Sequence, residues 1–91
     1  MIRKRPFPLI DVAATGRNIH ALRKAHGYSV TELQEYLDLE SSQSIYFWQQ
    51  GKYLPTIDHL YALSFLFDVS IDTILCPLAM PMSDSSNQTS R

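Results

Sequence analysis

The chain has 91 residues, of which 45% are hydrophobic, enough for one small helical core, and its net charge of −1 gives little support for a nucleic-acid partner. It has no apolar run long enough to span a membrane, and its basic start lacks the long apolar stretch of a secretory signal. The single cysteine, Cys76, excludes an internal disulfide framework and suggests a reducing cytoplasm.

The charges are distributed unevenly along the chain. Residues 1–24 carry six basic side chains and one acidic side chain, whereas residues 25–91 carry two basic and eight acidic side chains. This asymmetry is typical of a protein that contacts phosphate on one side only. An ordinary solvated surface with a basic tail is the alternative.

Residues 1–13 are predicted to form a flexible, basic N-terminal arm. Prolines in this segment oppose a helix and favour extended backbone. Ahead of a DNA-binding domain, such an arm can reach phosphates or a neighbouring groove, which makes Arg3, Lys4 and Arg5 candidate contacts. A frayed terminus is the alternative.

The predicted folded domain, residues 14–76, starts with a helix that Thr15 caps and that ends near Ala25, with Ile19 and Leu22 facing inward. A second helix begins at Ser29, because Glu32 completes an S-x-x-E capping box. Its apolar or aromatic residues recur at helical spacing, at Val30, Leu33, Tyr36 and Leu37. Residues 38–42 are of types that favour turns and helix caps, so they are expected to end this helix and begin the next one.

The third helix is predicted to end near Gln50, with Gly51 in the left-handed conformation. Ile45 and Trp48 lie three residues apart and are expected to point inward. The outward stripe consists of amides and aromatic side chains, namely Gln43, Tyr46, Phe47 and Gln50. Two short helices joined by a tight turn, the second with such a stripe, form a helix-turn-helix pattern, which indicates a DNA-binding module.

Thr56 is expected to cap a fourth helix whose surface is apolar on nearly all sides, so it is either central to the core or shared with a partner. Ser70 then caps a short last helix that ends near Leu75. Residues 77–91 contain prolines and a polar end, and are predicted to be a disordered tail.

The order of motifs in residues 16–75 resembles the Cro/λ-repressor-type helix-turn-helix family, also called XRE-like. The matching positions are Gly16, Ile19, Leu22, Arg23, Gly27, Ser29, Leu33, Ile45, Trp48, Gly51, Lys52, Pro55, Phe67, Val69, Ser70, Ile74 and Leu75. The resemblance implies an all-α, compact five-helix λ-repressor-like domain with helices 2 and 3 as the helix-turn-helix.

The resemblance also assigns the DNA contacts. It places Ser42, Gln43 and Phe47 at base-facing positions, with Tyr46 and Gln50 alongside. Phosphate contacts are expected from hydroxyls near the helix start and from cations nearby, namely Ser41, Ser44, Lys52 and Arg17. The alternative is that Tyr46 and Phe47 cover core or partner surface.

Arg23 is expected to be structural. In phage repressors of the family, the matching Arg pairs with a Glu near the end of the recognition helix, and this chain has Gln49 there. The neutral amide can still accept a hydrogen bond from the guanidinium, with less strength than a carboxylate.

Other positions depart from the family pattern in and around the turn. Gln34 replaces a small Ala, Asp38 replaces the turn Gly, and Glu40 makes the turn one residue longer. Val30 replaces a Gln that contacts phosphate in phage repressors. We therefore expect a surviving turn, few phosphate contacts and a contact register uncertain by about one residue.

These observations predict a sequence-specific DNA-binding transcriptional regulator, a repressor acting as a homodimer on double-stranded DNA. The resemblance implies dimer contacts from the last helix and the residues after it, at Ile71, Leu75, Leu78 and Met80. The alternative is an antitoxin or interaction module with a protein partner, such as a toxin or another regulator. An enzyme is not expected, because no metal spacing, cofactor motif or nucleophile–base pair is present.

Overall fold

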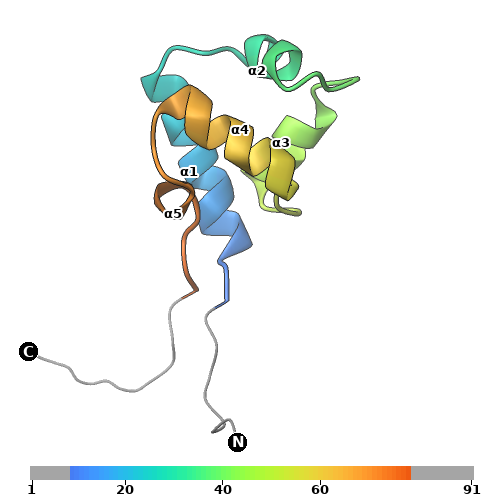
Figure 1. The fold of residues 1–91 in the computed structure, drawn as a ribbon. Coiled ribbons are helices and arrows are strands. Elements are labelled where there is room, and N and C mark those ends of the chain that lie inside the picture. The colour runs from blue at the N-terminus through green and yellow to red at the C-terminus, as the bar shows by residue number, and fades with distance from the viewer. Residues whose placement is uncertain (1–8, 79–91) are drawn as a thin grey trace, which may run out of the picture.

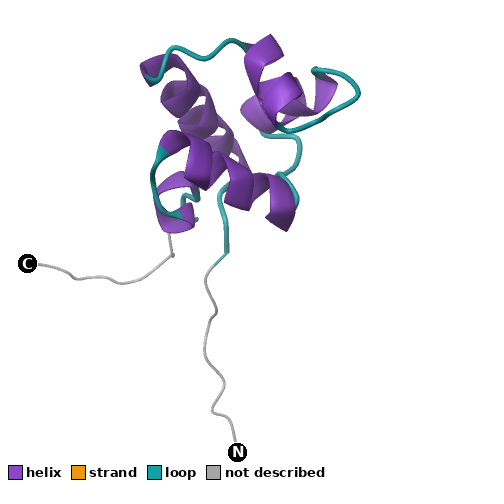
Figure 2. Cartoon of the chain, turned by 45° about the horizontal axis from the view of Figure 1, so that its top comes forward, coloured by secondary structure: helices purple, strands orange, loops and turns teal. Residues whose placement is uncertain are grey.

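Residues 9–78, the part of the chain that the computed structural model describes, form five helices and no strand (Figures 1 and 2). The helices are α1 (Val12–Ala25), α2 (Val30–Tyr36), α3 (Gln43–Gln50), α4 (Ile57–Phe67) and α5 (Ile71–Ile74). This arrangement confirms the predicted all-α fold. None of the helices in this range is long and apolar enough to cross a membrane.

The first helix begins four residues earlier than predicted, and Thr15 does not cap it. Asp11 is the N-cap, and its Oδ1 accepts a hydrogen bond of 2.9 Å from the Ala14 amide. Thr15 is fully buried, and its Oγ1 accepts a hydrogen bond of 2.9 Å from the Cys76 amide. The predicted cap was wrong because Thr15 lies on the inward face of α1, where its hydroxyl binds a distant segment.

The other helix boundaries follow local sequence rules. The Ser29–Glu32 capping box is formed, with hydrogen bonds of 2.8 and 3.0 Å in its two directions. Thr56 and Ser70 cap α4 and α5 through their side-chain oxygens. Gly51 ends α3 with a φ of 78°. The predicted caps Ser29, Thr56 and Ser70 and the predicted ends of the third and last helices are therefore confirmed to within a residue.

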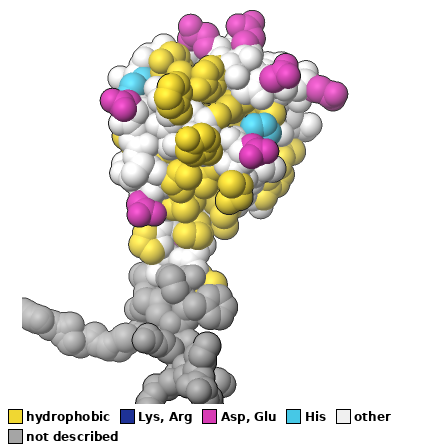
Figure 3. Space-filling model, viewed as in Figure 1, with side chains coloured by type: hydrophobic (Ala, Val, Ile, Leu, Met, Phe, Trp, Pro, Cys, Tyr) yellow, Lys and Arg dark blue, Asp and Glu magenta, His cyan; other side chains and the backbone are white. Residues whose placement is uncertain are grey.

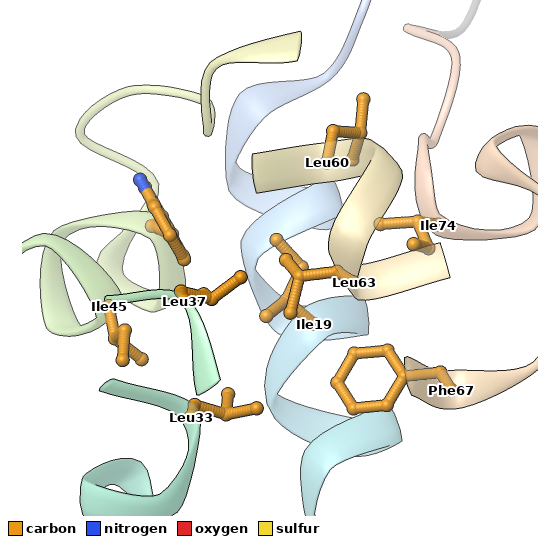
Figure 4. Close-up of a cluster of buried hydrophobic side chains, with 9 residues drawn as sticks. Ile19, Leu33, Leu37, Ile45, Leu60, Leu63, Phe67 and Ile74 are labelled. Atoms are coloured by element: carbon orange, nitrogen blue, oxygen red, sulfur yellow. The ribbon is translucent and has the colours of Figure 1, made fainter. Parts of the chain in front are cut away.

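All five helices contribute to one hydrophobic core, which Figure 4 shows in close-up. Ile19 of α1 lies near its centre, between side chains of α2 and α3 on one side and of α4 and α5 on the other. The buried apolar residues are Ile19, Leu33, Leu37, Ile45, Trp48, Leu60, Leu63, Phe67 and Ile74. Burial of Ile45 and Trp48 confirms that α3 directs this stripe inward and leaves the opposite stripe outside.

The two ends of the described segment lie side by side. The Leu78 amide donates a hydrogen bond of 2.8 Å to the Leu9 carbonyl, and Ile10 pairs with Pro77. The Asn18 side-chain amide bonds the Thr73 and Ile74 carbonyls at 2.6 and 2.9 Å. The folded unit therefore extends beyond the expected limits of 14 and 76. The rest of the predicted arm and tail, residues 1–8 and 79–91, lies outside the described residues.

The most extensive contact between two helices joins α1 to α3. A Cβ on Gly16 would overlap the Trp48 carbonyl oxygen and lie 3.1 Å from that of Gln49. A Cβ on Gly51 would lie 2.8 Å from the Ala13 Cα. Both contacts are with backbone atoms, which cannot rotate away as a flexible side chain can. Glycine at these positions therefore sets the distance at which α1 holds α3.

Gly16→Ala is expected to destabilise the protein by about 3 kcal/mol or more, because the helices must separate to admit a methyl group. Chemical unfolding followed by far-UV circular dichroism measures this loss. Gly27→Ala is the control, since Gly27 has a φ of 75° but no atom near its Cβ position. It should cost about 1–2 kcal/mol from backbone strain alone. Equal losses in the two variants would contradict the close-approach explanation.

Candidate nucleic-acid interface

The outward face of α3 presents a short stripe of polar and aromatic side chains. Gln43, Tyr46 and Gln50 are exposed, whereas Ile45 and Trp48 on the opposite face are buried. Gln43 and Gln50 are seven residues apart, which places them on the same face about 10 Å apart along the axis. The structure thus brings three of the five predicted base-reading side chains together on one accessible surface.

Phe47 is only half-buried, because the loop after α3 folds back over it. Its ring meets the Tyr53 ring edge-on, with centroids 5.7 Å apart. The Lys52 ammonium lies 5.6 Å from the centre of the Phe47 ring, within the range of a cation–π contact. This contact of Tyr53 was not predicted from the sequence, where the only sign of it is an aromatic residue six positions after Phe47. Phe47 therefore has an intramolecular packing role whatever else it contacts.

Three serines surround the start of α3. Ser42 occupies the N-cap position but makes no side-chain capping bond, and it is half-buried. The exposed Ser41 instead provides the local bond, since its Oγ accepts a hydrogen bond of 3.3 Å from the Gln43 amide. Its hydroxyl can still donate a hydrogen bond to another acceptor. The half-buried Ser44 lies in the first turn.

The turn between α2 and α3 keeps its shape without the family's usual glycine. Asp38 adopts the left-handed conformation with a φ of 56°, as predicted for a short polar residue. Gln34, half-buried, donates its side-chain amide to the Leu39 carbonyl at 3.4 Å. The bulky residue that replaces Ala thus bonds to the backbone of the longer turn.

A polar network joins α1 to the end of α3. Arg23 donates a hydrogen bond of 3.0 Å from Nε to Gln49 Oε1 and one of 2.9 Å from Nη1 to the Tyr28 carbonyl. The structural role predicted for Arg23 is therefore confirmed. Gln49 is a neutral amide, so this acceptor brings no negative charge to offset that of the guanidinium.

His20 completes this network, and its role was missed from sequence. Its Nδ1 lies 3.3 Å from both Gln49 Oε1, which can only accept, and Arg23 Nη2, which can only donate. One nitrogen cannot satisfy both partners at once. His20 therefore bonds either Gln49 or Arg23, depending on its tautomer.

The charges around α3 differ between its two sides. The helix itself carries none, and α2 exposes Glu32 and Glu35. Exposed cations lie on α1 and after α3, at Arg17 and Lys52. Because α1 begins at Val12, Arg17 lies in its second turn rather than at its start.

The predicted arm contacts Arg3, Lys4 and Arg5 lie outside the described residues. Within residues 9–78, no three His, Cys, Asp or Glu side chains are grouped to hold a metal ion.

Comparisons with known proteins agree with this architecture. The HTH_3 helix-turn-helix family model matches residues 19–74. The restriction-modification controller protein C.AhdI from Aeromonas hydrophila superposes with a TM-score of 0.62 at 19% identity, over 70% of this chain and 96% of that chain. The DNA-binding domain of BldD gives a TM-score of 0.61 at 18% identity, over 72% and 94%. At these low identities, the two similarities show that the fold is shared and nothing more.

A third solved structure is more similar in sequence. SinR, the master regulator for biofilm formation solved in complex with DNA, is 30% identical with a TM-score of 0.59, over 66% of this chain and 95% of that chain. The comparison with curated proteins gives no match. The family match and this similarity show that the chain belongs to the Cro/C1-type (XRE) helix-turn-helix family of DNA-binding transcription regulators.

Gln49→Glu is expected to stabilise the protein by about 1 kcal/mol, because a charge-assisted bond to Arg23 replaces a neutral one. Thermal unfolding at neutral pH measures the gain. Gln50→Glu is the control, since it adds the same charge to the same helix end at an exposed position. It should change stability by less than about 0.5 kcal/mol. A Gln49→Glu variant that is no more stable than Gln50→Glu would show that the Arg23 bond does not respond to charge.

Proposed function

We propose that this protein is a sequence-specific transcriptional repressor that reads the major groove of double-stranded DNA with α3, as a homodimer on a two-fold-symmetric site. The observation that carries the proposal is the exposed stripe of Gln43, Tyr46 and Gln50 on a helix held rigidly against α1. The family membership supports it, and so does the similarity to SinR, whose structure is a complex with DNA.

The chemistry of the stripe suits base reading. A Gln amide can pair bidentately with adenine, and an aromatic ring can contact the thymine methyl group. Gln43 and Gln50 lie about 10 Å apart, so they span about three base pairs at 3.4 Å each. We assign base reading to Ser42, Gln43, Tyr46, Phe47 and Gln50. Phe47 contributes through its exposed edge, because Tyr53 and Lys52 cover the rest.

Few groups are available to contact phosphate. We assign this role to Ser41, Ser44, Lys52 and Arg17, with arm contacts from Arg3, Lys4 and Arg5. The acidic α2 contributes nothing favourable toward a polyanion. Each subunit should therefore bind weakly, and joining two subunits raises affinity through simultaneous contact with two half-sites about 34 Å apart. The proposed location is the cytoplasm, where the DNA and a reducing environment coincide.

An interaction module for a protein partner, as in an antitoxin, is the second candidate. The observation that favours it is the exposed Tyr36 beside Glu32 and Glu35 on α2, an acidic and aromatic surface that DNA would not attract. An antitoxin of this kind would also bind its own operator, so the two functions overlap. Co-purification with a small basic protein would support this candidate.

Selection of binding sites from random duplex DNA tests the main proposal. We expect enrichment of a site with two-fold symmetry, bound with an affinity that falls as salt rises. No enrichment, with only weak binding at low salt, would refute a sequence-specific role for this chain.

Gln43→Ala and Lys52→Ala should separate base reading from phosphate contact. Gln43→Ala should lose about 1–3 kcal/mol on the selected site and little on altered sites, because it removes a base contact. Lys52→Ala should weaken binding to all sequences alike and reduce the salt slope by about 1. Fluorescence anisotropy on the selected site and on single-base variants, at several salt concentrations, measures both effects. Equal losses on every sequence for both variants would refute the base-reading role of Gln43.

A further inference from the structure

The outward face of α4 exposes three large apolar side chains in a row. Ile57, Tyr61 and Phe65 are 76%, 68% and 78% exposed, whereas Leu60, Leu63 and Phe67 of the same helix are buried. The three follow one another at a spacing of four residues, so they form a continuous stripe along the helix. We call Ile57, Tyr61 and Phe65 the α4 ridge. Figure 3 shows apolar side chains running across this face of the molecule.

Such a surface is a candidate interaction site. The largest apolar patch on a soluble domain, typically about 300–600 Å², often has a function. The ridge also borders a hollow, lined by Tyr61, Ser64, Phe65, Asp68, Val69 and Ser70. A partner's side chain can enter this hollow while its neighbours cover the ridge. None of the three ridge side chains belongs to the hydrophobic core or packs against it.

The charges around the ridge exclude DNA as its partner. Acidic side chains surround the apolar band in Figure 3, and no Lys or Arg of the described residues is visible on this face. Asp58 and Asp68 lie at the two ends of α4, and Asp72 follows on α5. This negative rim repels a polyanion.

The ridge and the DNA-reading stripe can be occupied at the same time. α3 directs Ile45 and Trp48 into the core, and α4 directs Leu63 and Phe67 into the same core. The outward faces of the two helices therefore point away from that shared core in different directions. A partner on the ridge leaves Gln43, Tyr46 and Gln50 free.

We propose that the α4 ridge is covered by the α4 ridge of a second copy of this chain, which makes it the centre of the dimer. The inference rests on the homodimer of the proposed function and names its interface. In a two-fold arrangement each copy contributes the same patch, so an apolar stripe with Tyr61 at its middle can cover itself. The two reading helices then remain on the outside of the pair.

The available area supports a second copy as the occupant. Two aromatic rings and an isoleucine, each about three-quarters exposed, provide on the order of 400 Å² per copy. A ridge-to-ridge contact also covers the neighbouring surface of α4 around these side chains, so the two copies bury on the order of 1,000 Å², the lower limit for a specific interface.

This assignment differs from the dimer contacts expected from sequence. Ile71 and Leu75 are half-buried and pack against the core of their own subunit. Leu78 is exposed and lies beside Leu9, and Met80 lies outside the described residues. The larger exposed apolar area therefore belongs to α4, not to α5.

Sedimentation equilibrium of the full chain, from micromolar to millimolar concentration, tests the proposal. The wild type should dimerise, and Phe65→Lys should weaken dimerisation by at least about tenfold. Tyr36→Lys is the control, because it makes the same change at a partly exposed aromatic residue of α2. It should leave the dimerisation constant unchanged. Thermal unfolding establishes that both variants fold, as expected for changes at exposed positions.

The salt dependence of the dimerisation constant provides a second test, because the proposal predicts its direction. The acidic rims of two copies repel each other, and added salt screens this repulsion, so dimerisation should tighten as salt rises. DNA binding by each subunit should weaken over the same range. A basic partner held by the acidic rim would instead be released by salt.

Several outcomes would overturn the proposal. A wild type that stays monomeric at millimolar concentration would do so, as would a dimer that Phe65→Lys leaves unchanged. Selection of a two-fold site by such a dimer would leave the proposed function intact and reject only the ridge as its interface. Conversely, a dimer that Phe65→Lys disrupts, with no DNA site selected, would support the ridge and reject the proposed function.

Discussion

The close backbone contact between α1 and α3 is the constraint on which the rest of the structure depends. A helix of eight residues such as α3 is not stable alone in water, so its position must come from packing. Gly16 and Gly51 let the Trp48 carbonyl and the Ala13 backbone approach closely on either side of the crossing. Trp48 then fills the space beneath α3. The packing of α3 against α1, and not the exposed side chains themselves, therefore decides which side of α3 faces outward.

The Arg23 network is a second connection between α1 and α3, and it adds a positive charge at the contact between them. A half-buried guanidinium is satisfied here by two neutral acceptors, Gln49 and the Tyr28 carbonyl. A carboxylate would bind it more strongly and would cancel its charge. The neutral amide keeps the connection while leaving one positive charge next to α3, which carries none. Compared with a carboxylate at this position, we expect Gln49 to lower stability slightly and to make the potential around α3 more favourable to an anion.

The sequence predicted those features that depend on nearby residues, and it missed those that depend on distant ones. The capping box at Ser29 and the left-handed Gly51 follow from local chemistry and were correct. Thr15 satisfies the same local rule for a cap, yet its partner is the Cys76 amide, 61 positions away. The partial burial of Phe47 depends in the same way on how the following loop places Tyr53. For α4, a helix apolar on nearly all sides, no sequence periodicity showed which stripe would be left outside.

In the proposed dimer, the DNA-reading surface and the α4 ridge should respond to salt in opposite directions, which would link them. In the proposed dimer, DNA affinity is the product of phosphate contacts that salt weakens and an α4 contact that salt strengthens. Below the concentration at which the free chain dimerises, both terms enter the apparent affinity for a two-fold site. The salt dependence measured there is therefore shallower than the number of phosphate contacts implies. Once the chain is fully dimeric, only the phosphate term is left and the full dependence returns. Below the dimerisation concentration, the proposed α4 contact makes operator occupancy rise with the square of the protein concentration, while it offsets part of the loss that salt causes.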